Sequence, residues 1–226
     1  MNFLSFTFAI FLLISLFVYY MAPKRFQWMV LLAANTLFYA CSGIGNLAFI
    51  LFSSLITFFG AKFISDLNSS LKARKAELSK EDFKLEKKRV QGKKRLLLLG
   101  MLVLNVGILF YLKYWRVLVG SKTLLLPLGI SFYTFQTMGY ILDVYWEKTE
   151  PEKNIFKFAL FASFFPQIVQ GPIAIYNDLA CQLYEGHDLR YENIKYGFQL
   201  ILWGMFKKVI IADRMAVAIN AILPVK

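Results

Sequence analysis

The chain has 226 residues, of which 58% are hydrophobic and only 18% are charged. A soluble domain has about 45–50% apolar residues, glycine included, and about 25% charged residues. This chain therefore has too little polar surface for a water-soluble globule, and its mean hydropathy of +0.53 agrees. At about 20 residues per crossing, its length suits roughly seven membrane spans. Composition excludes a soluble globular domain and predicts an integral membrane protein.

The net charge of +12 would suggest a nucleic-acid partner in a soluble protein, but the charge is unevenly distributed. Between Asp66 and Arg95, eleven Lys and Arg residues stand against five Asp and Glu residues, which is half of the whole excess. Apart from Phe83, no aromatic residue interleaves with them, as base stacking would require. We predict a basic cytoplasmic loop between membrane spans, with anionic-lipid binding as the functional alternative, and no nucleic-acid partner.

The first half of the chain is expected to cross the membrane on both sides of this loop. Asn2–Ala22 is an apolar run followed by Lys24 and Arg25. A signal peptide would have its positive charges before the apolar core, so we predict a retained first span with the N-terminus outside. Further apolar runs cover residues 26–41, 47–64 and 96–112.

These runs define the expected organisation of the chain. Residues 1–65 are predicted to hold three spans and residues 66–95 the basic cytoplasmic loop, in which Lys and Glu spaced three and four apart favour a surface helix. Residues 96–226 are predicted to hold the remaining membrane helices. The predicted fold class is all-α: a polytopic transmembrane helix bundle of about seven hydrophobic segments, some of them broken or re-entrant.

Two consecutive segments in the second half are apolar overall but carry many hydrogen-bonding groups. Gln136, Tyr140 and Asp143 are four and three residues apart and share one helical face. A polar stripe on a membrane helix usually faces the bundle interior or a wet cavity. The sequence therefore predicts that these residues line a substrate tunnel, with hydrogen bonding between helices as the alternative.

The following apolar segment, residues 156–176, is interrupted by Pro166 and by Gly171-Pro172. Gln167 and Gln170 lie between these interruptions. Broken helices at membrane depth are tolerated only inside protein or along a cavity. We therefore include both glutamines among the tunnel candidates.

Three ordered motifs in this half resemble a known family. They are Pro127-Leu-Gly-Ile-Ser-Phe-Tyr-Thr-Phe-Gln136 with the following Tyr140-Ile-Leu-Asp-Val-Tyr145, then Phe164-Phe-Pro-Gln-Ile-Val-Gln-Gly-Pro-Ile173, and Leu202-Trp-Gly-Met-Phe-Lys-Lys-Val-Ile-Ile-Ala-Asp-Arg214. Their order and spacing are similar to those of the membrane-bound O-acyltransferase family, in its alginate O-acetyltransferase-like branch. The branch often has a basic residue before the tyrosine of its Gly-Pro-Ile motif, whereas Ile175 precedes Tyr176 here.

The resemblance implies a membrane enzyme that moves an acyl group, here expected to be acetyl, onto a hydroxyl of an exported or cell-wall polysaccharide. Its donor is expected to be acetyl-CoA or another acyl thioester arriving from the cytoplasm, with no bound cofactor and no metal. Expected partners are membrane lipids, the polysaccharide acceptor and other exopolysaccharide-modification subunits. A transporter or flippase half with a polar-lined pathway is the alternative that the broken spans leave open.

The catalytic residues of the family have no counterpart in this sequence. The family's histidine on a later helix and its Trp-His-Gly motif are both absent. The single histidine, His187, lies in a charged loop between Gly186 and Asp188, which is unlike the site of a general base held away from bulk water. We therefore assign no catalytic residue, expect an incomplete chain that represents the N-terminal part of a longer enzyme, and predict that it is inactive alone.

The last hydrophobic segment carries a basic cluster. Lys207, Lys208 and Arg214 are candidates for binding the phosphates of the donor, and an interfacial cluster that orients the helix is the alternative. Asp213 is neither three nor four residues from Lys207 or Lys208, the spacings at which side chains meet on an α-helix.

Overall fold

The computed structural model describes residues 6–75, 79–119, 129–168 and 171–222. The chain divides into two compact units, Met1–Gly186 and His187–Lys226. The described residues form helices and no strand, which confirms the predicted all-α class.

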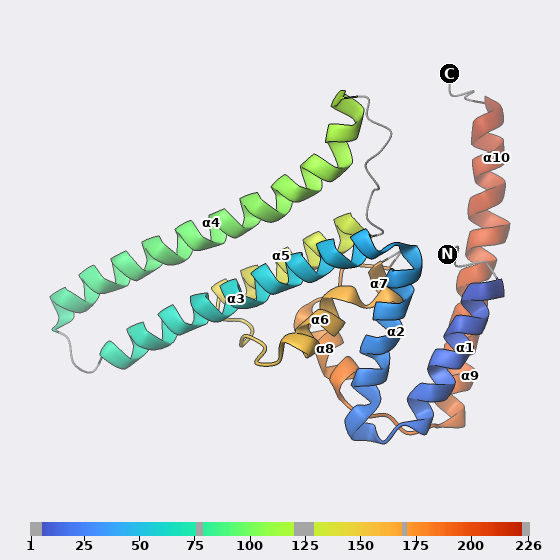
Figure 1. Ribbon diagram of the computed structural model, residues 1–226, viewed down its shortest axis with the longest axis horizontal. Helices are drawn as coiled ribbons and strands as arrows, with labels where there is room; N and C mark the ends of the chain where they lie inside the picture. Colours follow the sequence, from blue (N-terminus) through green and yellow to red (C-terminus); the bar gives the residue numbers. More distant parts are fainter. Residues whose placement is uncertain (1–5, 76–78, 120–128, 169–170, 223–226) are drawn as a thin grey trace. The chain divides into compact units, whose positions relative to one another are not determined.

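The first unit contains a helix for each apolar run expected in it (Figure 1). In chain order the elements are α1 (Phe6–Met21), the short 3₁₀ turn η1 (Lys24–Phe26), α2 (Gln27–Ser42), α3 (Ile44–Arg74), α4 (Lys80–Val119), α5 (Ile130–Tyr145), α6 (Ile155–Ser163), α7 (Phe165–Ile168) and α8 (Tyr176–Tyr184). Pro23 lies between α1 and η1, and Gly43, with φ +123°, ends α2. Both breaks arise because proline and glycine do not continue a helix there.

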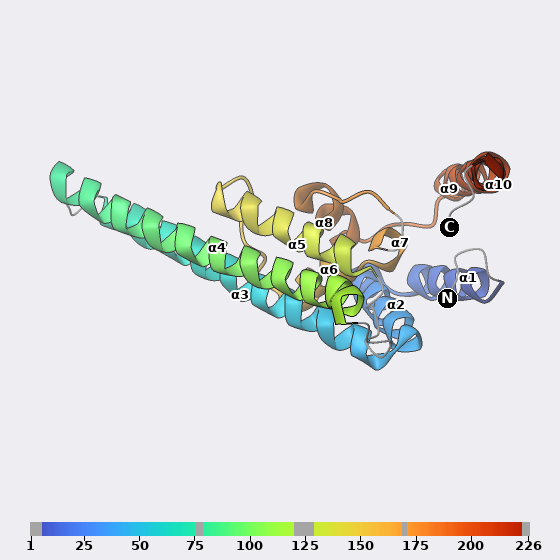
Figure 2. The ribbon, with the colours of Figure 1, turned by 90° about the horizontal axis from the view of Figure 1, so that it is seen from above.

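Two of the described helices are long and apolar enough to cross a membrane by length and composition, over Leu47–Arg74 of α3 and Lys80–Tyr114 of α4. These two helices run side by side as a hairpin, and α5 packs against both of them in the half of the hairpin away from its turn (Figures 1 and 2). The predicted basic loop is helical here, because α3 continues to Arg74 and α4 begins at Lys80. The expected count of seven hydrophobic spans stays a prediction.

Aromatic side chains dominate the core of the first unit. One buried cluster joins α3, α4, α5, α6 and α8, and the rings of Tyr140 and Phe158 lie 4.7 Å apart in it. A second cluster contains the rings of Phe38 and Phe165, 5.1 Å apart, where α2 meets α7. Phe8 of α1 packs edge-on against both. The aromatic-rich composition therefore serves packing between helices as well as the surface.

The second unit is a run of helix from Tyr191 to Ile222. It comprises α9 (Tyr191–Phe206), a π-helical stretch η2 (Lys207–Ala212) and α10 (Asp213–Ile222). Its backbone hydrogen bonds span five residues rather than four over η2, so side chains five apart come onto one face there.

Candidate functional site at the broken helix

The apolar segment that carries Pro166 is broken, as the sequence predicts. Helix α6 ends at Ser163, Phe164 leaves the helical conformation with ψ 101°, and α7 starts at Phe165. A helix end leaves its last carbonyl groups without intrahelical partners. Since this break is buried, other side chains must supply the missing hydrogen bonds.

Two buried amide side chains from different helices supply them. Asn35 of α2 donates through Nδ2 to the carbonyl of Leu160 (3.5 Å) and to Oγ of Ser163 (3.2 Å). Its Oδ1 accepts from the backbone N–H of Phe165 (3.2 Å). Gln136 of α5 donates through Nε2 to the carbonyl of Phe161 (3.0 Å). Both amides are only 1% exposed, so they hold the two sides of the break from inside the bundle.

Gln167 stabilises the segment just after the break through two hydrogen bonds. Its Nε2 donates to the carbonyl of Pro172 (2.5 Å), and its own carbonyl accepts from the N–H of Gly171 (2.6 Å). A Cβ at position 171 would lie 2.7 Å from that carbonyl oxygen, which explains the glycine in the motif. Oε1 of Gln167 is buried, with no hydrogen-bond partner among the described residues.

Gly129 brings the first two family-like motifs into direct contact. It precedes α5 with φ +70°, a left-handed conformation that glycine adopts at no steric cost. A Cβ at this position would lie 1.9 Å from Cγ2 of Ile168. Helix α5 therefore begins directly against α7, and only glycine satisfies both the backbone and the space.

A second polar network joins α5, α6 and α8 around Glu152. The backbone N–H of Glu152 donates to the hydroxyl of Tyr140 (2.9 Å). Its carboxylate accepts from the N–H groups of Lys153 and Asn154 and from the hydroxyl of Tyr176 (2.7 Å). The rings of Tyr140 and Tyr176 are 4.7 Å apart. Glu152 thus ties the segment before α6 to both neighbouring helices.

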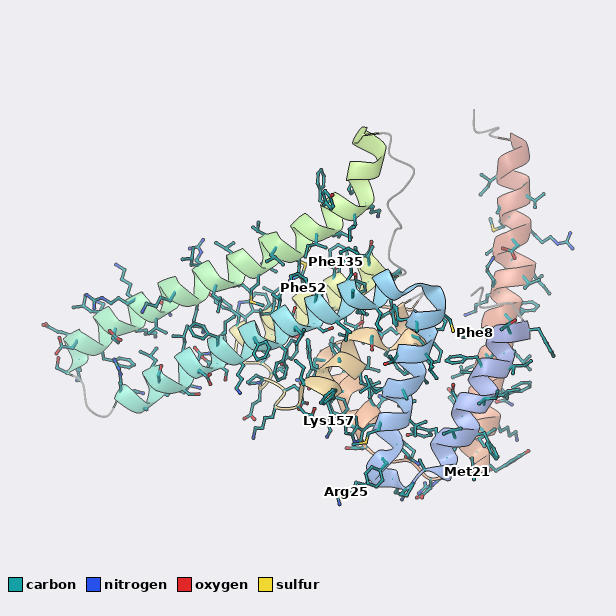
Figure 3. All side chains as sticks on the ribbon, in the orientation of Figure 1. Phe8, Met21, Arg25, Phe52, Phe135 and Lys157 are labelled. Atoms are coloured by element: carbon teal, nitrogen blue, oxygen red, sulfur yellow. The ribbon has the colours of Figure 1, made fainter. Side chains whose placement is uncertain are left out.

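Lys157 extends this network to α2 (Figure 3). Its Nζ lies 5.0 Å from the ring of Tyr184 and 5.9 Å from the ring of Trp28. The Tyr184 hydroxyl donates to the Lys157 carbonyl (2.7 Å). Burial raises the pKa of Tyr184 above its ordinary value, and its interaction with the Tyr176 hydroxyl opposes that shift. Tyr184 therefore stays a neutral donor.

A polar pocket of about 540 Å³ lies beside Glu152, between α3 and the turn that follows α5. Charged side chains of both signs line it, together with a buried amide: Lys62, Asp66, Asn68, Lys72, Glu147 and Glu152. Helical spacing along α3 places Lys62, Asp66 and Lys72 on one side of that helix. Because both signs are present, the pocket can hold a ligand through hydrogen bonds and through either charge.

One wall of the pocket is closed by an ion pair between α3 and the turn that follows α5, with Lys94 of α4 nearby. Nζ of Lys72 lies 2.7 Å from the Glu147 carboxylate, and Glu147 adopts φ +59°. Nζ of the buried Lys94 reaches the carbonyl of Tyr145 (3.4 Å) at the end of α5. The hydrogen bond from Lys72, with the charges of Lys72 and Lys94, lowers the pKa of Glu147 although burial opposes them.

The structure separates the predicted site residues into distinct groups. Gln136 and Tyr140 face the interior, and their polar atoms are engaged between helices, while Asp143 is half-buried near the end of α5. Gln167 lies at the break, and Gln170 lies outside the described residues. These contacts are those of helix-to-helix hydrogen bonding, and tunnel lining stays a prediction for all five residues.

The basic cluster of the second unit is exposed along one helix. Lys208 pairs with Asp213 although they are not at α-helical spacing, because the intervening π-helix brings residues five apart onto one face. Nζ of Lys207 lies 5.2 Å from the ring of Trp203. The role of Lys207, Lys208 and Arg214 in donor binding stays a prediction.

Sequence reasoning missed Asn35 and Glu152. Asn35 could have been recognised as a candidate, because an amide within the apolar run of residues 26–41 needs a hydrogen-bond partner in a membrane. Its partners are up to 130 residues away in the chain, so the partner could not be named. Glu152 offered no such signal, since a carboxylate after a proline in a polar stretch is ordinary.

Known proteins match most of the chain. It is 31% identical over 208 residues to the probable alginate O-acetylase of Pseudomonas fluorescens, covering 92% of this chain and 38% of that protein. It is 32% identical over 225 residues to the corresponding protein of Azotobacter vinelandii, covering 92% of this chain and 41% of that one. A peptidoglycan O-acetyltransferase of Helicobacter pylori is 32% identical over 160 residues, which cover 54% of this chain and 30% of that protein.

The chain spans about two fifths of the length of the alginate O-acetylases that it matches. No family model matches it, and no solved structure matches it either. The matches to the alginate O-acetylases agree with the motifs that meet at the broken helix. Over the part that it shares with them, the chain is similar to the alginate O-acetylases, and these matches support the resemblance of its three motifs to the membrane-bound O-acyltransferase family, in its alginate O-acetyltransferase-like branch.

Proposed function

We propose that this chain is part of a membrane-embedded O-acetyltransferase that esterifies hydroxyl groups of an exported or cell-wall polysaccharide. The observation that carries the proposal is the match of 92% of the chain to alginate O-acetylases. The match to a peptidoglycan O-acetyltransferase adds a relative with a different polymer in its name. What these names share is acetyl transfer to a polysaccharide, and that shared chemistry is what we assign.

The described part of the chain contributes to this activity by holding a broken helix, α6 and α7, inside the bundle. Acyl transfer needs donor and acceptor to be fixed in a reactive geometry, and a break lets backbone line an internal site at membrane depth. Asn35, Gln136 and Gly129 fix the path of the chain through the break. The donor is a thioester such as acetyl-CoA: transfer breaks its carbonyl carbon–sulfur bond, forms the ester bond to the acceptor oxygen, and releases the free thiol together with the proton that the hydroxyl gives up.

The chemical step itself is assigned to none of the described residues. His187 is exposed and lies outside the broken helix, and a general base must be within hydrogen-bond reach of the acceptor hydroxyl. We therefore propose that these 226 residues do not transfer acetyl groups by themselves.

The test compares a strain in which the encoding gene is disrupted with the same strain carrying an intact copy. The amount of exported polysaccharide and its alkali-labile acetyl per sugar are measured in both. Acetyl transfer predicts that acetyl per sugar falls on disruption and returns with the gene, at an unchanged amount of polymer. A drop in exported polymer with unchanged acetyl per sugar would instead support the transporter alternative.

A further inference from the structure

One face of the basic end of α4 forms a continuous cationic ridge. Lys80, Lys84 and Lys88 follow one another at intervals of four residues, and Lys87 and Arg95 fall on the same side. Each of these five side chains is exposed. We call this set the basic ridge, and its outer part, from Lys80 to Lys88, lies in the first turns of α4, which begins near the tip of the α3–α4 hairpin (Figure 1).

The acidic residues beside the ridge are mostly engaged elsewhere. Asp82 accepts from the hydroxyl of Ser79 (2.8 Å) at the start of α4. Glu86 faces α3 and pairs with Arg74 (3.3 Å). Glu81 remains, at the edge of the ridge, so the outer ridge keeps a net positive charge.

The outer end of the ridge, at Lys80 and Lys84, lies too far from the apolar part of α4 to serve lipid headgroups. At 1.5 Å per residue, Lys88 lies about 12 Å, Lys84 about 18 Å and Lys80 about 24 Å along the helix before Leu96, where the apolar part begins. The headgroup layer is only about 5–8 Å deep on each side, and charges in water are screened beyond about 8–10 Å. Because α4 is one continuous helix over Lys80–Val119, the ridge cannot fold back onto the surface at the usual tilts of membrane helices.

We propose that the outer basic ridge docks the acidic face of a soluble protein in the aqueous compartment that the hairpin enters. Exposed lysines in line, repeated once per helical turn, match a row of carboxylates on a partner surface. A second copy of this chain does not fit, since its net charge is also strongly positive. Single-stranded RNA fits less well, because Glu81 borders the ridge and Phe83, the aromatic residue nearby, is half-buried rather than fully exposed for stacking.

The test uses the whole chain in nanodiscs of zwitterionic phosphatidylcholine, which removes anionic lipid as a competitor. The probe is a fluorescent polyglutamate peptide, with a polyuridine oligonucleotide of equal charge as the alternative ligand, both at about 0.15 M salt. The ridge variant combines Lys80→Gln, Lys84→Gln and Lys88→Gln. The matched control combines Arg89→Gln, Lys93→Gln and Arg95→Gln, which removes the same charge from positions after the outer ridge and nearer the membrane, Arg95 being at the inner end of the ridge.

We expect the ridge variant to bind the peptide at least about tenfold more weakly, and the control to change binding less than about threefold. A parallel experiment uses the chain in detergent, without nanodiscs, and measures its binding to phosphatidylcholine vesicles that contain about one third phosphatidylglycerol. In this experiment the control variant should lose more of its vesicle binding than the ridge variant does. Equal losses by both variants in the peptide arm would overturn the proposal. So would tighter binding of polyuridine than of polyglutamate, or a ridge variant that loses vesicle binding more than the control. Circular dichroism of each variant verifies that α4 is intact.

Discussion

Gly129→Ala is predicted to be among the most damaging single-methyl additions in this chain. The substitution leaves polarity unchanged and adds one carbon at the point where α5 meets α7. That carbon would lie 1.9 Å from Cγ2 and 3.0 Å from the carbonyl oxygen of Ile168. Ile168 is fully buried, so neither atom can move aside without disturbing the packed core.

The expected cost has two parts. Holding alanine at φ +70° costs about 1 kcal/mol or slightly more. Overpacking against Ile168 adds about 1–3 kcal/mol. Together they lower the free energy of unfolding by about 3 kcal/mol, and in an Ile168→Ala background, where the clashing methyl group is gone, the cost should fall to about 1 kcal/mol.

Gly139→Ala is the matched control on the same helix. No atom lies within 4 Å of a Cβ built at position 139, and alanine is favoured over glycine in a helix by up to about 1 kcal/mol. The assay is reversible unfolding of the purified chain in mixed detergent micelles, followed by tryptophan fluorescence. The reasoning fails if Gly129→Ala is as stable as Gly139→Ala, or if Ile168→Ala gives no relief.

Three further predictions concern the break, the pocket wall and the histidine. Asn35→Leu should lower the free energy of unfolding by about 2–3 kcal/mol, because it leaves the N–H of Phe165 buried without its acceptor, and amide exchange should rise at the break; unchanged exchange there would contradict it. The pKa of Glu147 is lowered in the folded chain, so its pair with Lys72 stabilises above the ordinary pKa of glutamate and is lost as pH falls through the lowered value; being largely exposed, it should contribute under about 1 kcal/mol. Glu147→Gln should remove the part of the acid-induced drop in Tm that comes from this ion pair. An identical drop in the original chain and in the Glu147→Gln variant would contradict the prediction. The purified chain should transfer no acetyl group from acetyl-CoA, and turnover that His187→Ala abolishes would refute both that expectation and the dismissal of the histidine.

Local patterns predicted the helices of this chain well, because apolar runs and helix breakers act over short distances. Pro166 predicted the break between α6 and α7, and Gly43 lies in the turn expected after the second apolar run. The stripe of Gln136 and Tyr140 was expected on one inward face, and both side chains are buried. These features depend on spacing within one helix, which the sequence displays directly.

Contacts between distant segments could not be predicted in the same way. The partners of Asn35 lie on α6 and α7, and the ion pair of Lys72 is with a residue after α5. Nothing in the local pattern states which helices become neighbours. The π-helix also escaped prediction, because its residues Lys207–Ala212 are ordinary helix formers and only its backbone pairing differs. That difference alone decides whether Lys208 meets Asp213.

We propose that acetyl transfer depends on a helix break held in place by the contact between α5 and α7. The most direct measurement is the alkali-labile acetyl per sugar in polysaccharide from strains whose gene carries Gly129→Ala or Gly139→Ala, normalised to the amount of protein in the membrane. We predict that Gly129→Ala lowers acetyl per sugar toward the level of the disrupted strain, while Gly139→Ala leaves it at the level of the intact gene. Full acetylation with Gly129→Ala at equal protein amount would contradict the account.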